Sequence, residues 1–295
     1  MAKLNKRESE GIRLQKHSQW GDVVKRLTRD RLAMVGLVIV LLLILVAIFA
    51  DVIAPYDYTA QDLSNRLAWP SAQHLLGTDN FGRDLLSRII YGARTSLLVA
   101  LLSLVISTVI GVILGAFAGY FGGWAETIIM RIMDIIMAIP QILLAVSIQA
   151  ALGTGIFNTA LAISISGIPM GVRIIRAQIM SIRDEEYVEA AIATGSGSIR
   201  VLFRQILPNC LAPLIVDMSL RVGMAIMAIS GLSFIGLGVQ PPTAEWGSIM
   251  TAGRTYMRDF WPLATFPGVA IFLALFGFNV LGDGLRDAMD PKLKD

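Results

Sequence analysis

Long stretches with few or no charged residues recur along the chain, each near the length of a membrane-spanning helix. A helix needs about 20 apolar residues to cross ~30 Å of hydrocarbon. Six stretches are candidates: residues 32–54, a span within 95–125, 127–151, 157–172, 211–238 and 262–281. Gly153-Thr154-Gly155 divides the third from the fourth, because glycines permit a turn and residues 135–172 are too long for one helix. The pattern predicts an all-α polytopic membrane protein with six transmembrane helices.

Basic residues assign a side of the membrane to each loop. An even number of spans places both termini on one side, and cytoplasmic segments are enriched in Lys and Arg. Nine of the 25 Lys and Arg residues precede residue 32, and eighteen fall on the side shared by the termini. Both termini are therefore expected in the cytoplasm. The first apolar stretch lacks an A-x-A cleavage pattern, so it is interpreted as an uncleaved span.

Composition narrows the class of protein. Hydrophobic residues make up 55% of the chain against a usual ~45–50%, and charged residues 16% against a usual ~25%. So large a share of apolar residues excludes a disordered protein. The uncharged stretches cannot form helices with a polar face toward water, so they argue against a soluble α/β enzyme. The net charge of +3, without a basic stripe interleaved with aromatics, argues against a nucleic-acid partner. Membrane lipid is the expected surrounding.

Few residues are available for metal, redox or nucleotide chemistry. The single cysteine, Cys210, excludes an intrachain disulfide and a cysteine-based zinc site. The two histidines, His17 and His74, lie far apart in polar segments and are interpreted as solvated side chains. Residues 77–84 (GTDNFGRD) have the glycine spacing of a phosphate-binding loop but lack its Lys and Ser or Thr. We expect no metal site, no catalytic residue, no bound cofactor and no ATPase site in this chain.

Loop lengths and charge divide the chain into four segments. They are a cytoplasmic segment (1–31), a first transmembrane helix with an outer loop (32–94), a five-helix core (95–288) and a cytoplasmic tail (289–295). Within the first segment, residues 20–27 are predicted to form an amphipathic helix on the inner leaflet. The core contains a long inside loop at residues 176–208.

The inside loop carries helix start and stop signals. Ser181 begins a capping-box-like pattern (SIRD), and the helix that follows is expected to run through residues 187–193. Gly195 comes next, a residue suited to the left-handed backbone that closes a helix. Ser198 is expected to cap a second helix that Pro208 limits. The apolar residues of this helix fall at helical spacing: Ile199, Leu202, Phe203 and Ile206.

Two short helices joined by a tight turn fit two interpretations. They can enter a groove on a soluble partner, or they can pack on the inner face of the protein as an ordinary loop. The residue pattern by itself favours neither.

The same loop resembles the cytoplasmic signature of ABC-importer permease subunits. The matching residues are Glu189, Ala190, Ala191, Gly195, Leu207 and Pro208, whereas Gln205 is polar where that family has an apolar residue. In the family this loop is the coupling helix, which docks on an ATPase subunit. The resemblance implies that those six residues, within the 181–208 helical loop, couple this chain to ATP hydrolysis.

Further segments are similar to the C-type permeases of dipeptide, oligopeptide and nickel importers, and most similar to dipeptide permeases. They are residues 77–88 (GTDNFGRDLLSR), 92–97 (GARTSL), 242–247 (PTAEWG), 266–268 (FPG), 282–287 (GDGLRD) and 290–292 (DPK). The resemblance implies an ABC type I importer permease core in the bacterial inner membrane, importing dipeptides or short peptides. A nickel chelate, glutathione or another small solute are alternative substrates.

The resemblance also implies partners. They are a homologous permease subunit that completes a heterodimer, two ABC ATPase subunits that bind ATP and Mg, and a periplasmic or extracellular solute-binding protein. Two rival functions are weaker. An ion-coupled secondary transporter usually has more spans and internal repeats, and an intramembrane enzyme would need His or a metal-ligand cluster within a span.

Charges inside the spans are expensive, at ~2.5–3.5 kcal/mol each at the bilayer centre. Asp217 and Arg221 are four residues apart in the fifth span, so they share a helix face. Arg131 and Asp134 are expected to pair in the same way in the third span. Structural salt bridges are the simpler interpretation of both pairs. The functional interpretation is that Asp217 and Arg221 face a water-filled translocation path at the subunit interface.

The outer segments are mostly polar, and by resemblance they lie where a solute-binding protein docks. The candidate docking residues are Arg83, Asp84, Glu245 and Trp246. Trp246 and Trp261 are also expected at the outer membrane–water interface. In the second span, glycines recur every four residues at 111, 115 and 119, which predicts the close approach of another helix.

Overall fold

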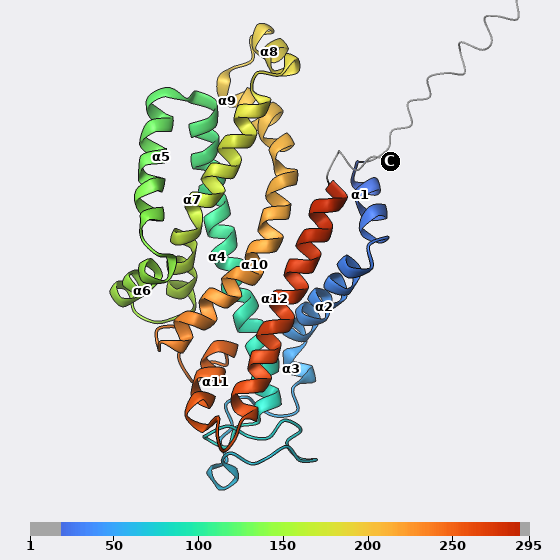
Figure 1. The fold of residues 1–295 in the computed structure, drawn as a ribbon, viewed down its shortest axis with the longest axis vertical. Coiled ribbons are helices and arrows are strands. Elements are labelled where there is room, and N and C mark those ends of the chain that lie inside the picture. Colours follow the sequence, from blue (N-terminus) through green and yellow to red (C-terminus); the bar gives the residue numbers. More distant parts are fainter. Residues whose placement is uncertain (1–18, 290–295) are drawn as a thin grey trace, which may run out of the picture.

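The computed structural model describes residues 19–289, which fold into a bundle of helices (Figure 1). In chain order the α-helices are α1 (Gln19–Leu27), α2 (Arg31–Ile48), α3 (Ala50–Ile53), α4 (Leu85–Phe121), α5 (Gly123–Ala138), α6 (Gln141–Leu152), α7 (Ile156–Ile182), α8 (Glu186–Ala193), α9 (Ser198–Val201), α10 (Leu211–Phe234), α11 (Trp246–Gly253) and α12 (Pro262–Met289). Shorter turns are η1 (Leu63–Asn65), the π-helical η2 (Leu202–Ile206), η3 (Leu207–Cys210) and η4 (Arg254–Tyr256).

Among residues 19–289, five helices are long and apolar enough to cross a membrane, and α5 with α6 make a sixth span if the bent pair counts as one. The expectation of an unbroken third helix over residues 127–151 is wrong, because α5 and α6 meet at 92°. The break falls at Ile139, which is in extended conformation, and Pro140, which also has a non-helical ψ of 130°. Proline cannot donate a helical hydrogen bond and disfavours helical backbone in the residue before it.

Several helices extend beyond the predicted apolar stretches. Helix α4 begins at Leu85, inside the segment assigned to the outer loop, because Asp84 caps it by accepting a 2.7 Å hydrogen bond from the Ser87 amide. Helix α7 continues to Ile182 and α12 to Met289. Hydropathy marks only the part of a helix that contacts hydrocarbon, so it misses charged turns at either end.

The long helices cross the bundle so that α8 and α9 lie at one end. Helix α1 and the C-terminal end of α12 lie toward the same end, and residues 54–84 with α11 lie at the opposite end (Figure 1). This arrangement agrees with termini that share a side with the inside loop. The basic residues of positions 1–18, the DPK segment and the tail from residue 290 lie outside the described residues.

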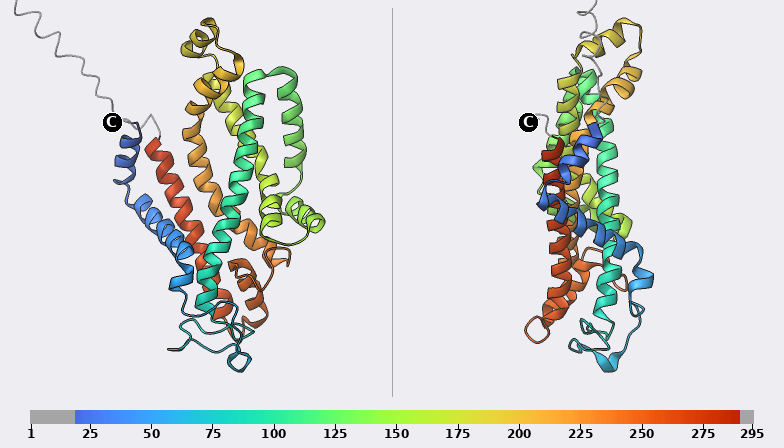
Figure 2. Two further views of the ribbon diagram at one scale, coloured as in Figure 1. Left: turned by 180° about the vertical axis from the view of Figure 1, so that it is seen from behind. Right: turned by 90° about the vertical axis from the view of Figure 1, so that its right-hand side faces the viewer.

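Glycines bring the helices close together, as the four-residue spacing predicted. A Cβ on Gly115 would lie 2.8 Å from the Val172 carbonyl oxygen of α7, and one on Gly119 would lie 3.0 Å from the Arg176 carbonyl oxygen. A second close approach joins α2 to α12, which lie side by side in both views of Figure 2. There a Cβ on Gly36 would lie 2.7 Å from the Leu281 amide nitrogen. Both contacts need residues without side chains.

A helix, α1, is present at the expected residues 20–27, with Lys25 and Arg26 in its last turn, and its place on the inner leaflet stays a prediction. Asp30 then caps α2 by accepting a 2.8 Å hydrogen bond from the Leu32 amide. Helix α1 packs against α12, where Leu27 lies near Gly284. The N-terminal segment is therefore tied to the last transmembrane helix.

Candidate functional site

The helical knob, defined as α8, α9 and η2, projects from the end of the bundle that carries α1 (Figure 1). Helix α8 begins after Glu185, whose side chain makes no capping bond. The predicted capping box at Ser181 is wrong, because α7 runs through this residue and the Ser181 hydroxyl donates to the Gln178 carbonyl at 2.8 Å. Within a continuing helix a serine bonds its own preceding turn.

The predicted glycine turn is confirmed. Gly195 has φ +84°, its amide donates to the Ile192 carbonyl at 2.9 Å, and the Ser196 amide donates to the Ala191 carbonyl at 3.1 Å. These two bonds form a Schellman motif, which needs a left-handed residue in that position. A Cβ on Gly195 would meet no atom within 4 Å, so backbone conformation alone accounts for the glycine.

The second helix of the knob differs from its prediction in two respects. Gly197, not Ser198, occupies the N-cap position, and the helix continues through η2 and η3 into α10 past Pro208. Leu202 and Ile206 are fully buried, but the other two residues of the expected apolar face are not. The buried residues around them come from α7, α8, α9 and η3 and form one cluster: Ile175, Ile179, Val188, Val201 and Cys210.

The knob therefore exposes large apolar side chains. They are Tyr187 (43% exposed), Ile192 (52%), Ile199 (65%) and Phe203 (48%). Of the residues carrying the family signature, Glu189, Ala190 and Gly195 lie exposed near this surface. Leu207 and Pro208 lie instead in η3, where the knob rejoins α10. The signature thus has one part on the projecting knob and one part at its base.

Cys210 closes the base of the knob. Its side chain is buried, and its thiol lies 3.5 Å from the Ile206 carbonyl oxygen. Burial raises the pKa of the Cys210 thiol to about 11. A thiol in such surroundings is a packing residue and is not poised for nucleophilic chemistry.

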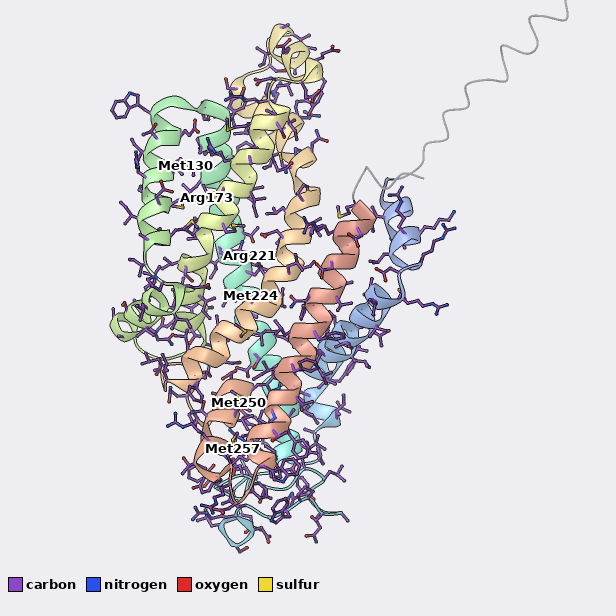
Figure 3. The ribbon with its side chains drawn as sticks, viewed as in Figure 1. Met130, Arg173, Arg221, Met224, Met250 and Met257 are labelled. Atoms are coloured by element: carbon purple, nitrogen blue, oxygen red, sulfur yellow. The ribbon has the colours of Figure 1, made fainter. Side chains whose placement is uncertain are left out.

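The expected contact between Asp217 and Arg221 is present in α10, with 3.4 Å between the Asp217 carboxylate and the Arg221 guanidinium. Arg221 also donates to the Gly167 carbonyl of α7 at 2.7 Å and to the Ser107 hydroxyl of α4 at 3.5 Å. Figure 3 shows Arg221 and Met224 about midway along the bundle. A single arginine therefore links three membrane-spanning helices.

A cavity of about 280 Å³ adjoins this pair. Its polar lining, besides Asp217 and Arg221, consists of Ser103, Ser107, Ser166 and Gln141. The remaining wall is apolar and includes Met170 and Met224. Hydroxyl, amide and charged groups at this depth can hold water or a polar solute, while methionines adapt to different shapes.

The expected pairing of Arg131 with Asp134 is wrong. Asp134 binds Arg173 of α7 at 2.7 Å, and Glu126 of α5 binds Arg176 of α7, whose Nε donates at 2.8 Å. Because α5 lies against α7, the arginines of α7 compete with Arg131 for the acidic side chains of α5. These two ion pairs join α5 to α7 near the end that carries the knob.

The outer polar cluster comprises His74, Asp79, Arg83, Asp84, Arg88 and Glu245. Asp79 accepts a hydrogen bond from the Arg83 Nε at 2.6 Å, and its carboxylate lies 3.4 Å from the Arg88 Nε. Asp84 lies 2.9 Å from the His74 Nδ1. His74 is therefore a structural partner of the residue that caps α4, not the solvated side chain expected from its polar neighbourhood.

Glu245 binds four donors from three helices. It accepts hydrogen bonds from the Ser233 hydroxyl of α10 at 2.7 Å, the Ser96 hydroxyl of α4 at 3.2 Å, and the amides of Gly247 and Ser248 at 2.8 Å each. The two amides open α11. Neither a motif nor the spacing identified this role, because two of the donors are remote in sequence.

Trp246 is also buried, at 1% exposure, and its indole donates to the Ile89 carbonyl at 2.9 Å. Its side chain therefore packs inside the protein and does not face a membrane–water interface. All four candidate docking residues are at most 4% exposed, so a binding protein cannot reach their side chains in this conformation. Trp261 is 47% exposed and packs edge-on against Trp69, 6.2 Å between ring centroids.

Acidic residues shape the exposed loop beyond this cluster. Asp57 accepts from the Thr59 hydroxyl at 2.7 Å, and Asp62 caps η1 through the Ser64 amide at 3.1 Å. Hydrogen bonds from Ser64 and Asn65 lower the pKa of Asp62. Within the described residues no group of three or more His, Cys, Asp or Glu side chains could hold a metal ion.

Comparison with known proteins identifies the family. The model described as binding-protein-dependent transport system inner membrane component matches residues 111–295. The model described as N-terminal TM domain of oligopeptide transport permease C matches residues 18–70. The structure of the MetNI methionine ABC transporter in inward-facing conformations has a TM-score of 0.54 and covers 69% of this chain and 96% of that chain. At 19% identity this likeness concerns the fold alone.

Sequence relatives cover nearly the whole chain. Dipeptide transport system permease protein DppC of Escherichia coli (strain K12) is 50% identical, over 90% of this chain and 91% of that protein. The protein of the same name from Alkalihalophilus pseudofirmus is 45% identical, over 94% and 91%. Di/tripeptide transport system permease protein DppC of Pseudomonas aeruginosa is 47% identical, over 89% of each. The chain belongs to the binding-protein-dependent transport system inner membrane components, as a multi-pass ABC-transporter permease subunit of the oligopeptide and dipeptide permease C type that is not itself an ATPase.

Proposed function

We propose that this chain is one permease subunit of an importer that carries dipeptides or other short peptides into the cell. The observation that carries the proposal is its 45–50% identity to three peptide permeases over about nine-tenths of the chain. Its partners are a homologous permease subunit, two ABC ATPase subunits that bind ATP and Mg, and a solute-binding protein outside the membrane.

The helical knob couples this subunit to an ATPase. Four exposed apolar side chains on a short projection suit a groove on a soluble partner, because burying them there removes apolar surface from water. In this proposal Glu189, Ala190, Ala191 and Gly195 form the docking tip. Leu207 and Pro208 form the base through which movement of the ATPase reaches α10.

The translocation path runs beside α10, between this subunit and its partner permease. The cavity at Asp217 and Arg221 supports this, because it combines polar groups with an apolar wall inside the membrane-spanning region. The core of residues 95–288 supplies one half of the path. The partner permease supplies the other half.

The solute-binding protein docks at the end of the bundle that carries α11, on exposed side chains of residues 54–84 and of the segment before α12. Candidates are Leu63, Trp69, Leu75, Met257 and Trp261, all at least 47% exposed. Arg83, Asp84, Glu245 and Trp246 take part indirectly, because their buried bonds hold this surface in shape. These four residues therefore lie beneath the docking surface and do not themselves contact the binding protein.

The test is uptake by the complete complex in proteoliposomes, with the solute-binding protein encoded beside this chain. We expect ATP-dependent accumulation of a labelled dipeptide that an excess of unlabelled dipeptide suppresses. Glutathione and a nickel chelate serve as competitors in the same assay. Accumulation of either of them without dipeptide uptake would contradict the peptide assignment and leave the permease family unchanged.

A further inference from the structure

Two cavities have one lining residue of α10 in common. The first is the 280 Å³ cavity at mid-bundle, and the second, of about 430 Å³, lies toward the end of α12 beside Arg286 and Met289. Asp217 lines both, whereas Arg221 lines only the first. Because α12 ends on the same side as the knob, the second cavity faces the cytoplasm. Asp217 therefore borders both cavities, and its partner Arg221 lies on the side of the first.

The contacts of the pair leave it able to change partners. The separation of 3.4 Å between Asp217 and Arg221 is long for a charge-assisted hydrogen bond, which is usually about 2.7–2.9 Å. Arg221 has a shorter bond to the Gly167 carbonyl, but among the described residues Asp217 bonds only to Arg221. A ligand that offers a cation to Asp217 and an anion to Arg221 would replace one loose contact with two.

A short peptide carries both charges at a suitable separation. The backbone positions of residues four apart on a helix are displaced by about 6 Å along its axis, so two side chains that lie 3.4 Å apart when paired can separate to about that distance. Two extended residues span at most about 7 Å. The α-ammonium of a dipeptide can therefore lie at Asp217 while its α-carboxylate lies at Arg221. The site and the zwitterion are each neutral overall, so no net charge is moved into the membrane.

The rest of the cavity accommodates variation in the peptide. Met170 and Met224 lie on its wall, and flexible thioethers pack against side chains of different shape. Ser103, Ser107 and Ser166 can bond a peptide group without selecting a particular residue. Such a lining recognises the backbone and termini of peptides as a class.

We propose that Asp217 and Arg221 form a charged partition between the two cavities, which opens when the termini of a passing peptide replace the ion pair. Asp217 binds the ammonium and Arg221 the carboxylate. This inference rests on the proposed function, since it requires a peptide as the transported solute. Each terminus of the peptide then has one binding residue in the membrane. Between transport cycles the ion pair closes the path.

The test compares substrates that differ in one terminal charge. Proteoliposomes with the complete complex and saturating solute-binding protein are given dialanine, its C-terminal amide or its N-acetyl derivative. Each variant is measured with the same binding protein, so the ratio of analogue to dialanine uptake reports changes in the membrane subunit alone. The variants are Arg221→Gln and Asp217→Asn. Arg173→Gln and Asp134→Asn, which change the ion pair between α5 and α7, are matched controls.

We expect Arg221→Gln to reduce dialanine uptake by about tenfold or more, because a charged hydrogen bond is lost. It should raise the amide-to-dialanine ratio, while Asp217→Asn raises the ratio for the N-acetyl derivative. The controls should leave both ratios unchanged. If Arg221→Gln and Asp217→Asn scale all three substrates by one factor, the pair is a structural salt bridge and the partition is refuted. Wild-type complex that takes up no dialanine would refute the proposed function, and this inference with it.

Discussion

The helical knob and the outer polar cluster lie at opposite ends of the bundle and are built in opposite ways. The knob closes its first helix with two bonds around Gly195, between residues three and five positions apart, and it leaves Ile199 and Phe203 exposed. In the outer cluster Glu245 binds Ser96, which is 149 residues away in the chain, and is fully buried. The knob is a local structure with an available surface, whereas the cluster is a long-range structure with its charged groups enclosed.

This difference separates two tasks of a transporter subunit. A docking element needs apolar surface that a partner can cover, and short-range bonds can hold it in shape without help from that partner. A polar cluster inside a protein needs every group bonded, because an unpaired buried group is costly. Substitutions in the two regions should therefore affect different measurements.

The largest effect is expected from Glu245→Ala. The substitution leaves four donors of α4, α10 and α11 without their acceptor and should lower the free energy of unfolding by about 3–5 kcal/mol. Thermal unfolding of the purified complex measures this loss. The matched control is Glu189→Ala in the exposed tip of the knob, which should unfold within a degree or two of wild type. Equal unfolding temperatures for the two variants would remove the contrast between the regions.

A second comparison lies within the knob, between neighbouring residues. Leu202 is fully buried, so Leu202→Ala should cost about 2–5 kcal/mol of stability. Phe203 is 48% exposed, so Phe203→Ala should change stability by only about 0.5 kcal/mol while it weakens binding of the ATPase subunit. Both variants are measured in both assays. Thermal unfolding reports the loss of stability, and pull-down of the ATPase subunit reports the loss of binding. A Phe203→Ala complex that retains full ATPase binding would argue against docking through this face.

An intermediate effect is expected from Gly195→Val. A left-handed backbone costs a branched residue about 1–2 kcal/mol, although the side chain itself meets open space. We expect normal insertion and pairing with the partner permease, but weaker ATPase binding or hydrolysis uncoupled from uptake. Glu189→Ala should have the same direction of effect. Gly195→Asn is the control, because asparagine tolerates this conformation.

Liposome assays of ATPase binding, stimulated hydrolysis and uptake decide this prediction. If Gly195→Val and Glu189→Ala match wild type in all three, the knob is a passive connector. If Gly195→Asn fails as badly as Gly195→Val, the glycine is needed for contact with the partner rather than for its backbone.

The smallest effect concerns Cys210 at the base of the knob. With a thiol pKa of about 11, the reactive thiolate is scarce at pH 8, and alkylation should be roughly 100-fold slower than in the unfolded chain. The rate in the folded protein should keep rising as the pH increases toward 11. Mass spectrometry after timed exposure to a maleimide follows the reaction, with Cys210→Ser as the blank. A rate that levels off near pH 9 would mean that the base is open to solvent.

Much of the fold could be predicted because its signals are local or repetitive. Apolar stretches identified the spans, basic residues assigned their direction, and Gly195 marked the turn of the knob. The spacing of Gly111, Gly115 and Gly119 predicted a helix contact that α7 makes. The break between α5 and α6 was missed, although Pro140 carried a signal for it. Hydropathy averages over a window and so hides a single proline.

The partners of charged groups could not be predicted in the same way. Asp134 was expected to bind Arg131 on its own helix, but the packing of α5 on α7 gives it Arg173. The burial of Glu245 and Trp246 likewise depends on α4 and α10, which meet α11 only in the folded protein.

By itself, the sequence determined the class of protein, the approximate spans, the turn at Gly195 and the shared face of Asp217 and Arg221. These features depend on interactions within about one helical turn or on the exclusion of polar groups from lipid. Only the tertiary structure decided which arginine binds Asp134, which apolar residues of the knob stay exposed, and that Asp217 borders two cavities. Those outcomes depend on how helices distant in sequence pack together, and each side chain bonds or buries against whichever neighbour that packing provides.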